Sequence, residues 1–167
     1  MKRNLLPSLL SSSIFCALIF STLTITSLSH ADTRHHATTD TDAAGSPGKA
    51  GAISRTIQIE MADDMRFTPA DITVKQGETI KFVVANKGKL IHEMVIGSAA
   101  ELAKHAEMMR KMPEMKHEEA NQITVEPGKT ADLIWQFSKA TKVDFACLEP
   151  GHFEAGMKGK VNVIVSK

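Results

Sequence analysis

Short apolar segments follow one another closely from residue 53 onward, and they limit what this chain can fold into more than any other feature. They are rich in Ile, Val, Thr and Phe and are bounded by Gly, Pro and Asp, which is typical of β-strands joined by turns. The segments cover residues 53–60, 71–75, 79–85, 90–96, 122–125, 131–137, 142–146 and 160–165. Strands of this length and spacing predict an all-β protein, a two-sheet sandwich of about eight strands.

One segment lacks the strand pattern. Residues 99–112 are rich in Ala, Glu, Leu, Lys and Met, which favour helix, and they show no alternation of apolar and polar positions. Pro113 limits the far end of this segment. We therefore expect one helix inserted in the sandwich, covering an edge or a loop region.

The first 31 residues have the features of a secretory signal peptide. A basic start with Lys2 and Arg3 precedes an apolar, hydroxyl-rich run and the small-x-small sequence at residues 29–31. A retained membrane anchor is the alternative, but Pro7 and many Ser and Thr interrupt the run, and no basic flank follows it. The prediction is a secreted, periplasmic protein with no membrane insertion after cleavage.

Composition divides the rest of the chain in two. Residues 32–52 are rich in Thr, Ala, Gly and Asp and predict a flexible leader, while residues 53–167 predict one domain. Loss of the signal peptide removes Lys2 and Arg3 and no acid, so acidic and basic residues nearly balance. This balance gives no indication of nucleic acid or an anionic membrane as a partner.

After cleavage of the signal peptide a single cysteine, Cys147, remains. Thiols are normally oxidised in secreted proteins, yet this cysteine has no partner for an intrachain disulfide. Such a cysteine is an inert buried thiol, pairs with another chain, or takes part in chemistry. Its neighbours decide between these interpretations.

Cys147, His152 and Met157 are spaced five residues apart within one segment between two predicted strands. Pro and Gly between them supply turns, so the loop can direct all three side chains to one place. Thiolate, imidazole and thioether are ligands that favour copper over calcium, magnesium or manganese. A second imidazole is needed, and His92 lies where another strand begins. Two imidazoles, a thiolate and a weak axial thioether are the ligands of blue-copper electron-transfer sites.

These residues resemble those of the cupredoxins, the family of plastocyanin, azurin and rusticyanin. Residues 92–97, the Met- and His-bearing helical segment and residues 145–157 resemble in particular the periplasmic cupredoxins associated with bacterial copper tolerance. The resemblance implies a Greek-key β-sandwich and one type-1 copper ion, with His92, Cys147 and His152 as equatorial ligands and Met157 as the axial one. Many cupredoxins carry Asn after the first His, where it braces the loop bearing the Cys; this chain has Glu93.

A second group of soft ligands lies on and after the predicted helix: His105, Met108, Met109, Met112, Met115 and His117. On a helix His105, Met109 and Met112 share one face. Packing of flexible Met side chains between helix and sandwich is the first interpretation. Weak binding of extra Cu(I) near these three residues is the second.

The resemblance implies one-electron transfer to a periplasmic redox partner, a cytochrome or a multicopper enzyme, in the setting of copper tolerance. The alternative is a protein that sequesters Cu(I) or oxidises it, using the Met/His segment. No nucleophile with a paired His and acid and no Gly-rich phosphate loop stands out, which favours an electron carrier over an enzyme. A copper nitrite reductase is excluded, because one domain lacks the histidines for a catalytic copper.

Overall fold

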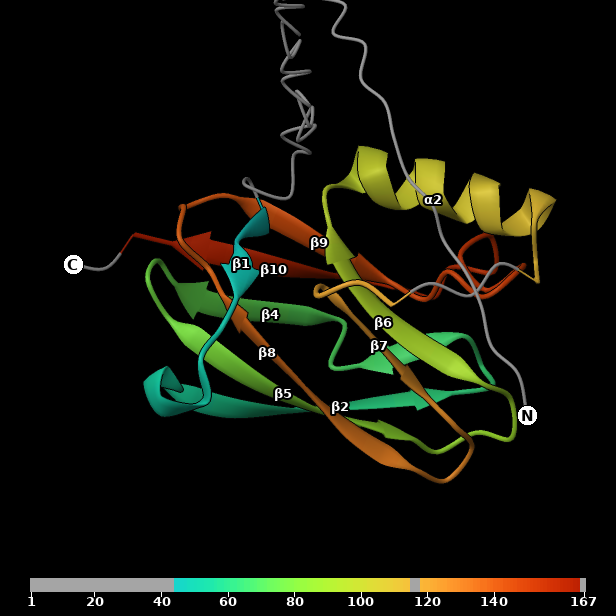
Figure 1. The fold of residues 1–167 in the computed structure, drawn as a ribbon, viewed down its shortest axis with the longest axis horizontal. Coiled ribbons are helices and arrows are strands. Elements are labelled where there is room, and N and C mark those ends of the chain that lie inside the picture. Colours follow the sequence, from blue (N-terminus) through green and yellow to red (C-terminus); the bar gives the residue numbers. More distant parts are fainter. Residues whose placement is uncertain (1–43, 115–117, 166–167) are drawn as a thin grey trace, which may run out of the picture. The chain divides into compact units, whose positions relative to one another are not determined.

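The computed structural model describes residues 44–114 and 118–165, which form two five-stranded sheets and one α-helix (Figure 1). The first sheet has the order β1 (Ser46–Pro47), β8 (Thr130–Gln136), β5 (Thr79–Asn86), β2 (Arg55–Ala62) and β3 (Arg66–Thr68). The second has the order β4 (Asp71–Lys75), β10 (Lys158–Ile164), β9 (Lys142–Ala146), β6 (His92–Gly97) and β7 (Gln122–Val125). Pairing is parallel between β2 and β5 and between β4 and β10, and antiparallel elsewhere. The predicted sandwich is confirmed.

All eight predicted strands are present, and β4, β7 and β9 have the expected bounds. Two further strands, β1 and β3, were not predicted. They contain two and three residues, which is too short for an alternating pattern to be recognised in the sequence. β1 also depends on a partner far along the chain, because it pairs with β8, whereas β3 pairs with the preceding strand β2.

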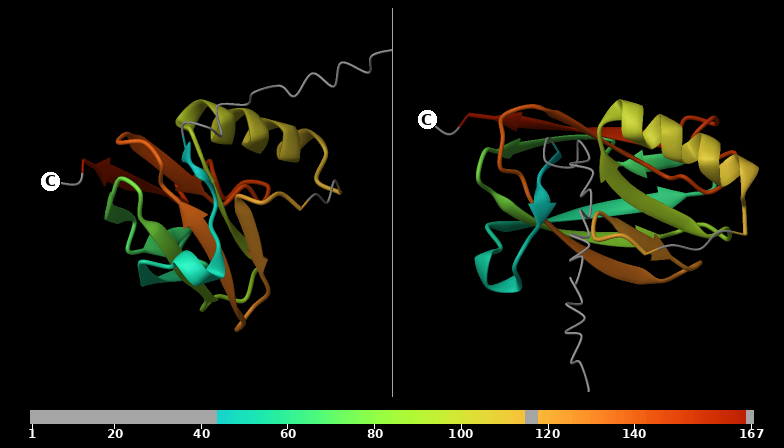
Figure 2. Two further views of the ribbon diagram at one scale, coloured as in Figure 1. Left: turned by 60° about the vertical axis from the view of Figure 1, so that its left-hand side comes forward. Right: turned by 45° about the horizontal axis from the view of Figure 1, so that its top comes forward.

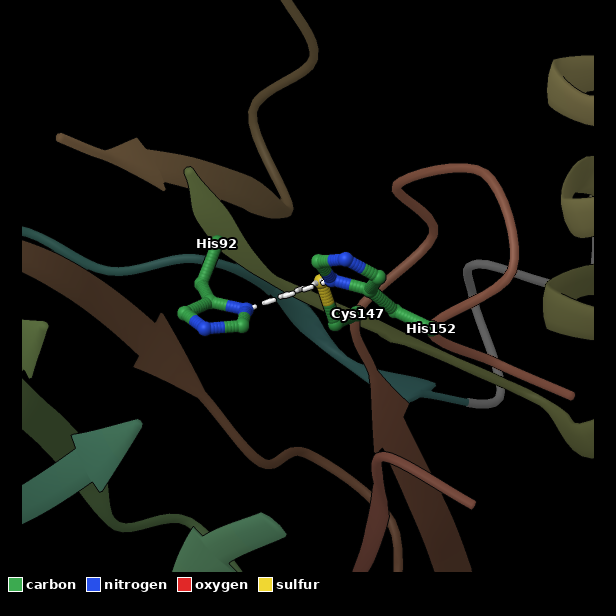
Figure 3. A group of neighbouring side chains, drawn as sticks. All are labelled: His92, Cys147 and His152. Atoms are coloured by element: carbon green, nitrogen blue, oxygen red, sulfur yellow. Dashed lines mark hydrogen bonds between the residues drawn. The ribbon is translucent and has the colours of Figure 1, made fainter. Parts of the chain in front are cut away.

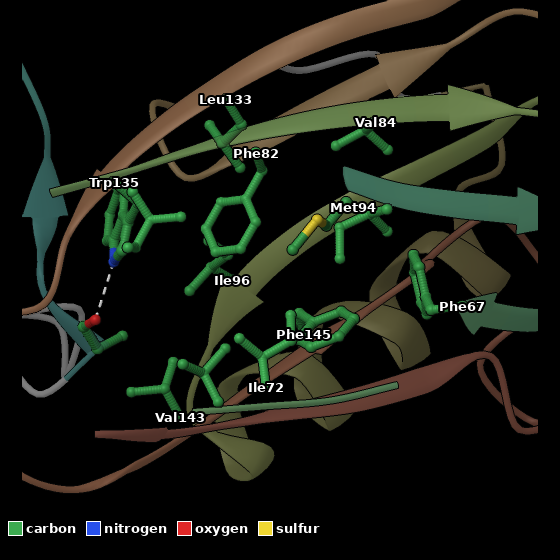
Figure 4. Packing of buried hydrophobic residues seen from close by; sticks show 14 of the residues in the cluster. Phe67, Ile72, Phe82, Val84, Met94, Ile96, Leu133, Trp135, Val143 and Phe145 are labelled. Carbon is green, nitrogen blue, oxygen red and sulfur yellow. Dashed lines mark hydrogen bonds between the residues drawn. The ribbon is translucent and has the colours of Figure 1, made fainter. Parts of the chain in front are cut away.

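Alternate residues of the strands point between the two sheets and form the main core (Figure 4). In β5, for example, Ile80, Phe82 and Val84 are wholly buried, while the residues between them are only partly covered. Phe67 and Phe145 meet edge to face, with ring centroids 5.0 Å apart, and so connect the two sheets. Burial of side chains from both inner faces is the main source of stability for such a sandwich.

Helix α2 (Ala99–Lys111) lies across the outer face of the second sheet, over β6 and β9 (Figure 1 and Figure 2). Ser98 and Glu101 form a capping box that satisfies backbone N–H groups at its first turn. A separate apolar cluster joins the helix to the sheet: Val95, Leu102, Ala106, Met109, Ala146 and Leu148. The expected helix is confirmed, and β6 and β9 are covered on both faces.

Residues 44–52 belong to the segment expected to be a flexible leader. In the structure they contain β1 and the 3-10 helix η1 (Ala50–Ala52), and the backbone carbonyl of Ala44 accepts a hydrogen bond from the Trp135 indole at 2.8 Å. The expected signal peptide and most of the leader lie outside the described residues, so those boundaries stay predictions. No helix in the described ranges is long and apolar enough to cross a membrane.

Candidate metal centre

Three of the predicted ligands converge at one end of the sandwich (Figure 3). His92 is the first residue of β6, Cys147 directly follows β9, and His152 lies in the loop between β9 and β10. The Nδ1 atoms of the two histidines are 3.2 Å apart, and the Cys147 Sγ lies 3.3 Å from the Nδ1 of His152 and 4.0 Å from that of His92. A metal ion could therefore contact all three side chains at once.

The loop that carries Cys147 and His152 is closed by its own backbone. The N–H of Cys147 donates to the carbonyl of Met157 at 3.1 Å, and the N–H of Met157 donates to the carbonyl of His152 at 3.0 Å. Gly151 and Gly156 turn the chain with φ of +88° and +95°, a region that other residues enter only with strain. These contacts hold residues 147–157 in a compact loop beside the three converging side chains.

Met157 is the fourth predicted ligand. Its side chain is wholly buried and belongs to the same core cluster as Cys147. Its backbone contacts with Cys147 and His152 place it beside both residues. A buried thioether in this position suits the role of a weak axial ligand.

The strand alternation of β9 continues into the loop and decides where Cys147 points. Ala146 and Leu148 face helix α2, and Cys147 between them faces the main core. Burial raises the pKa of the Cys147 thiol to about 12, so the metal-free site holds a protonated thiol. Burial, followed by the charge of His92, lowers the pKa of His152, which keeps this imidazole neutral and able to bind a metal.

Glu93 occupies the position after the first histidine where Asn is common in cupredoxins. Its backbone N–H donates to the Cys147 Sγ at 3.4 Å, and its side-chain Oε1 accepts a 3.0 Å hydrogen bond from the N–H of Leu148. The carboxyl therefore braces the loop bearing Cys147. Burial, together with the nearby charge of Glu149, raises the pKa of Glu93 from 4.5 to about 7.

Two residues that support the His92 side of the site were not identified from the sequence. The amide of Asn86 donates to the carbonyls of Leu90 and Val125 at 2.7 and 2.8 Å, which fixes the chain as it enters β6. Asp63, in the turn between β2 and β3, lies 3.1 Å from the Nε2 of His92. The Asn-Lys-Gly sequence at residues 86–88 is a recognisable turn signal, whereas nothing in the sequence placed Asp63 near His92.

Arg66, at the start of β3, is a third contact that sequence reasoning missed. Its Nη1 donates to the carbonyl of Ala155 in the ligand loop at 3.0 Å and to the carbonyl of Met65 at 2.7 Å. The guanidinium also lies against Gly156, leaving little room for a side chain there. The ligand loop is thus held from β3 as well as from β6.

The donor set suits copper. Two imidazole nitrogens and a thiol sulfur lie within 4.8 Å of one another, and no carboxylate of the described residues shares their group. His92 and Cys147 are wholly buried, and His152 is half-buried. Soft and borderline ligands favour copper over metals that prefer oxygen ligands.

The second group of soft ligands differs in burial from residue to residue. Met109 is buried against the sheet, whereas Met112 is 44% exposed at the end of α2. His105 and Met108 line a hollow of about 370 Å³ beside β6. Met115 and His117 lie outside the described residues.

The two-sheet sandwich and the His, Cys, His group at its end define a cupredoxin. The family profile described as "Copper binding proteins, plastocyanin/azurin family" matches residues 53–164, and the chain belongs to this family. It is 51% identical over 119 residues to the "Copper-resistant cuproprotein CopI" of Rubrivivax gelatinosus, covering 71% of this chain and 72% of that protein. It is 39% identical over 148 residues to the protein of the same name from Pseudomonas aeruginosa, covering 71% and 81%.

Solved structures share the fold. Reduced auracyanin from Roseiflexus castenholzii superposes with a TM-score of 0.58 at 21% identity, covering 69% of this chain and 99% of that one. Azurin iso-2 from Methylomonas sp. strain J superposes with a TM-score of 0.52 at 16% identity, covering 68% and 99%. Both comparisons support the cupredoxin sandwich.

Proposed function

We propose that this protein binds one copper ion as a type-1 centre and transfers single electrons. His92, Cys147 and His152 would be the equatorial ligands and Met157 the axial one. The observation that carries the proposal is the convergence of three donor atoms within 4.8 Å at the end of a rigid sandwich. Copper, when bound, supplies the one-electron change between Cu(I) and Cu(II).

The residues around the ligands limit rearrangement during that change. Cys147 is held by its contacts with Glu93 and Met157, and His92 is held by the strand β6 and by Asp63. A site fixed by packing and hydrogen bonds presents nearly the same geometry to both oxidation states. Such a site loses little free energy in reorganisation and suits rapid electron exchange.

Electrons would enter and leave through the half-buried His152. Residues around the ligands expose apolar surface: Leu90 and Ile91, just before His92, are 47% and 41% exposed, and Pro150 precedes His152 on the surface. A small apolar surface of this kind suits brief docking of a redox partner. We infer a periplasmic partner, a cytochrome or a multicopper enzyme.

The biological setting that we propose is copper tolerance in the bacterial periplasm. The relatives from Rubrivivax gelatinosus and Pseudomonas aeruginosa are both named copper-resistant cuproproteins. The signal peptide expected at residues 1–31 supports export. A carrier that cycles between Cu(I) and Cu(II) outside the cytoplasm agrees with the names of these relatives and with the expected export.

Redox titration of the copper-loaded protein tests the electron-transfer role. The proposal expects full reduction by one electron equivalent and full reoxidation, with the copper retained through repeated cycles. Release of copper on reduction would contradict the carrier role, because a carrier must hold both oxidation states.

A second candidate function is the sequestration or oxidation of Cu(I) by the Met/His segment. The hollow lined by His105 and Met108 favours it, because an imidazole and a thioether there face one space. Cu(I) titration against a competing chelator tests it. The candidate predicts that the wild-type protein binds a second Cu(I) and that the double variant His105→Gln/Met108→Leu does not. Met112→Leu, which changes a Met outside this hollow, serves as control. One bound Cu(I) in all three proteins would exclude it.

A further inference from the structure

We propose that Asp63 is a positioning residue for the copper centre: its carboxylate holds His92 with the proton on Nε2, so that Nδ1 is free to bind the metal. The inference rests on the copper function proposed above. Its starting observation is the 3.1 Å contact between Asp63 Oδ1 and His92 Nε2, on the side of the ring that faces away from Cys147 and His152.

The contact determines which nitrogen of His92 is protonated. A carboxylate only accepts hydrogen bonds, so the Nε2 facing Asp63 must carry the proton. The lone pair free to bind a metal is then on Nδ1. This atom lies 3.2 Å from the Nδ1 of His152 and 4.0 Å from the Cys147 Sγ. A metal ligand oriented through its other ring nitrogen by a carboxylate is a more basic ligand with a fixed ring orientation.

Asp63 is itself held in place. Its Oδ2 accepts a 2.8 Å hydrogen bond from the N–H of Lys89, and its Oδ1 accepts a 3.2 Å bond from the N–H of Leu90. Both donors belong to the segment that leads directly into β6 and His92. The turn between β2 and β3 is therefore tied to the ligand and to the backbone that carries it.

Gly88 provides independent support for a built contact. A Cβ atom at this position would overlap the carboxylate of Asp63, so the chain has room for Asp63 only because residue 88 is glycine. The N–H of Gly88 donates to the Asn86 side chain at 2.9 Å, which keeps this close approach in place. A carboxylate that only projects into solvent would not need a glycine beside it.

The carboxylate should also favour the more highly charged metal ion. A negative charge on the far side of the His92 ring stabilises Cu(II) more than Cu(I), because the attraction grows with the charge of the ion. Removal of Asp63 should weaken Cu(II) binding more than Cu(I) binding. The reduction potential of the centre should rise as a result.

The neighbouring carboxylate provides a matched control. Asp64 lies in the same turn, and its Oδ1 accepts a hydrogen bond from the N–H of Arg66 at 3.1 Å. Asp64→Asn therefore removes the same charge one residue away and leaves the Asp63–His92 contact intact. Asp63→Asn removes the charge with little change in shape, and Asp63→Ala removes the acceptor as well.

The first measurement uses the metal-free protein. Long-range ¹H–¹⁵N NMR of ¹⁵N-histidine-labelled samples reports which ring nitrogen of His92 carries the proton. We expect Nε2–H in the wild type and in Asp64→Asn, and a larger Nδ1–H population in Asp63→Ala. The second measurement is chelator competition, in which Asp63→Ala should bind Cu(II) about 10- to 100-fold more weakly. Cu(I) binding should weaken less, and the potential should rise in Asp63→Asn and Asp63→Ala.

Two outcomes would overturn the inference. An Asp63→Ala protein that folds, and whose His92 proton, Cu(II) affinity and potential match those of Asp64→Asn, would leave Asp63 with a purely structural role. A wild-type protein with no thiolate-to-copper absorption band would overturn the proposed function and this inference together. The first outcome leaves the copper function standing, so the two failures are distinguishable.

Discussion

The buried carboxyl of Glu93 accepts a 3.0 Å hydrogen bond from the backbone N–H of Leu148. This contact connects the strand that begins with one predicted ligand, His92, to the loop that begins with another, Cys147. The backbone N–H of Glu93 also donates to the Cys147 sulfur at 3.4 Å. Glu93 thus performs the bracing that Asn performs in many cupredoxins.

Loss of the Glu93 side chain should destabilise the protein. Glu93→Ala leaves the buried N–H of Leu148 without a partner, which costs about 1–3 kcal/mol of the free energy of unfolding. Glu93→Gln keeps an acceptor oxygen and should cost less. Urea unfolding of the metal-free proteins measures both. Equal stability of Glu93→Ala and wild type would show that the contact contributes nothing.

The pH dependence of stability should carry a contribution from Glu93 in the metal-free protein. Its pKa is raised from 4.5 to about 7 on folding. Between these pH values the folded state retains a proton that the unfolded state has lost. The contribution of Glu93 to stability is therefore fully present below pH 4.5 and is lost as pH rises to about 7. The loss should be about 3 kcal/mol.

The matched comparison for this pH effect is Glu93→Gln, which has no titrating group at this position. The difference in free energy of unfolding between the two proteins removes contributions from other groups, including His152. That difference should shift in favour of Glu93→Gln across the same pH range. Stability curves that run parallel would contradict the assignment of a raised pKa to Glu93.

Copper binding should release about one proton in mildly alkaline buffer. The buried Cys147 thiol, with its pKa raised to about 12, is protonated there and must lose its proton to bind a metal as thiolate. His152 has a lowered pKa and releases none. Isothermal titration calorimetry in buffers of different ionisation enthalpy measures the number, and Cys147→Ser is the control. Binding without proton release would mean that Cys147 is not a ligand.

Arg66 should restrain the ligand loop. Arg66→Ala removes the hydrogen bond to the Ala155 carbonyl and should cost about 0.5–1.5 kcal/mol locally. The expected result is faster hydrogen exchange of the Gly156 and Met157 amides, both of which bond within the loop. Arg55→Ala, which breaks an exposed ion pair with Glu78, is the control and should leave these amides unchanged. Equal protection in both variants would show that Arg66 does not restrain the loop.

Gly88 should be intolerant of a side chain. Gly88→Ala places a methyl group where the Asp63 carboxylate lies, so it should displace Asp63 and weaken Cu(II) binding as Asp63→Ala does. Gly51→Ala is the control, because a Cβ there meets nothing within 4 Å. Chelator competition measures both variants. Unchanged Cu(II) affinity in Gly88→Ala would show that the approach of Asp63 to Gly88 is not needed by the site.

Local features of the sequence predicted most of the fold and the centre of the site. Each long strand is marked by its own content of Ile, Val, Thr or Phe between turn residues, and Cys147, His152 and Met157 lie within one loop. His92 was found because a fourth ligand was needed and a strand begins there. These inferences required no knowledge of how distant segments pack.

The surroundings of the site could not be predicted in the same way. Asp63 is 29 residues from His92, and Arg66 is 89 residues from Ala155. Both contacts depend on how the turn between β2 and β3 is placed against other strands. The role of Met109 also depended on packing: its burial in the cluster between the helix and β6 and β9 agrees with the packing interpretation, while extra Cu(I) binding near His105, Met109 and Met112 stays a prediction.

The central claim is tested most directly by the visible absorption spectrum of the mature protein after addition of Cu(II), beside that of Cys147→Ser. The account predicts an intense thiolate-to-copper band in the red, or one split with a blue component, that is absent from the variant. A wild-type spectrum with only the weak absorption of ordinary Cu(II) complexes, unchanged by Cys147→Ser, would contradict it. In that case Cys147 would be a structural core thiol.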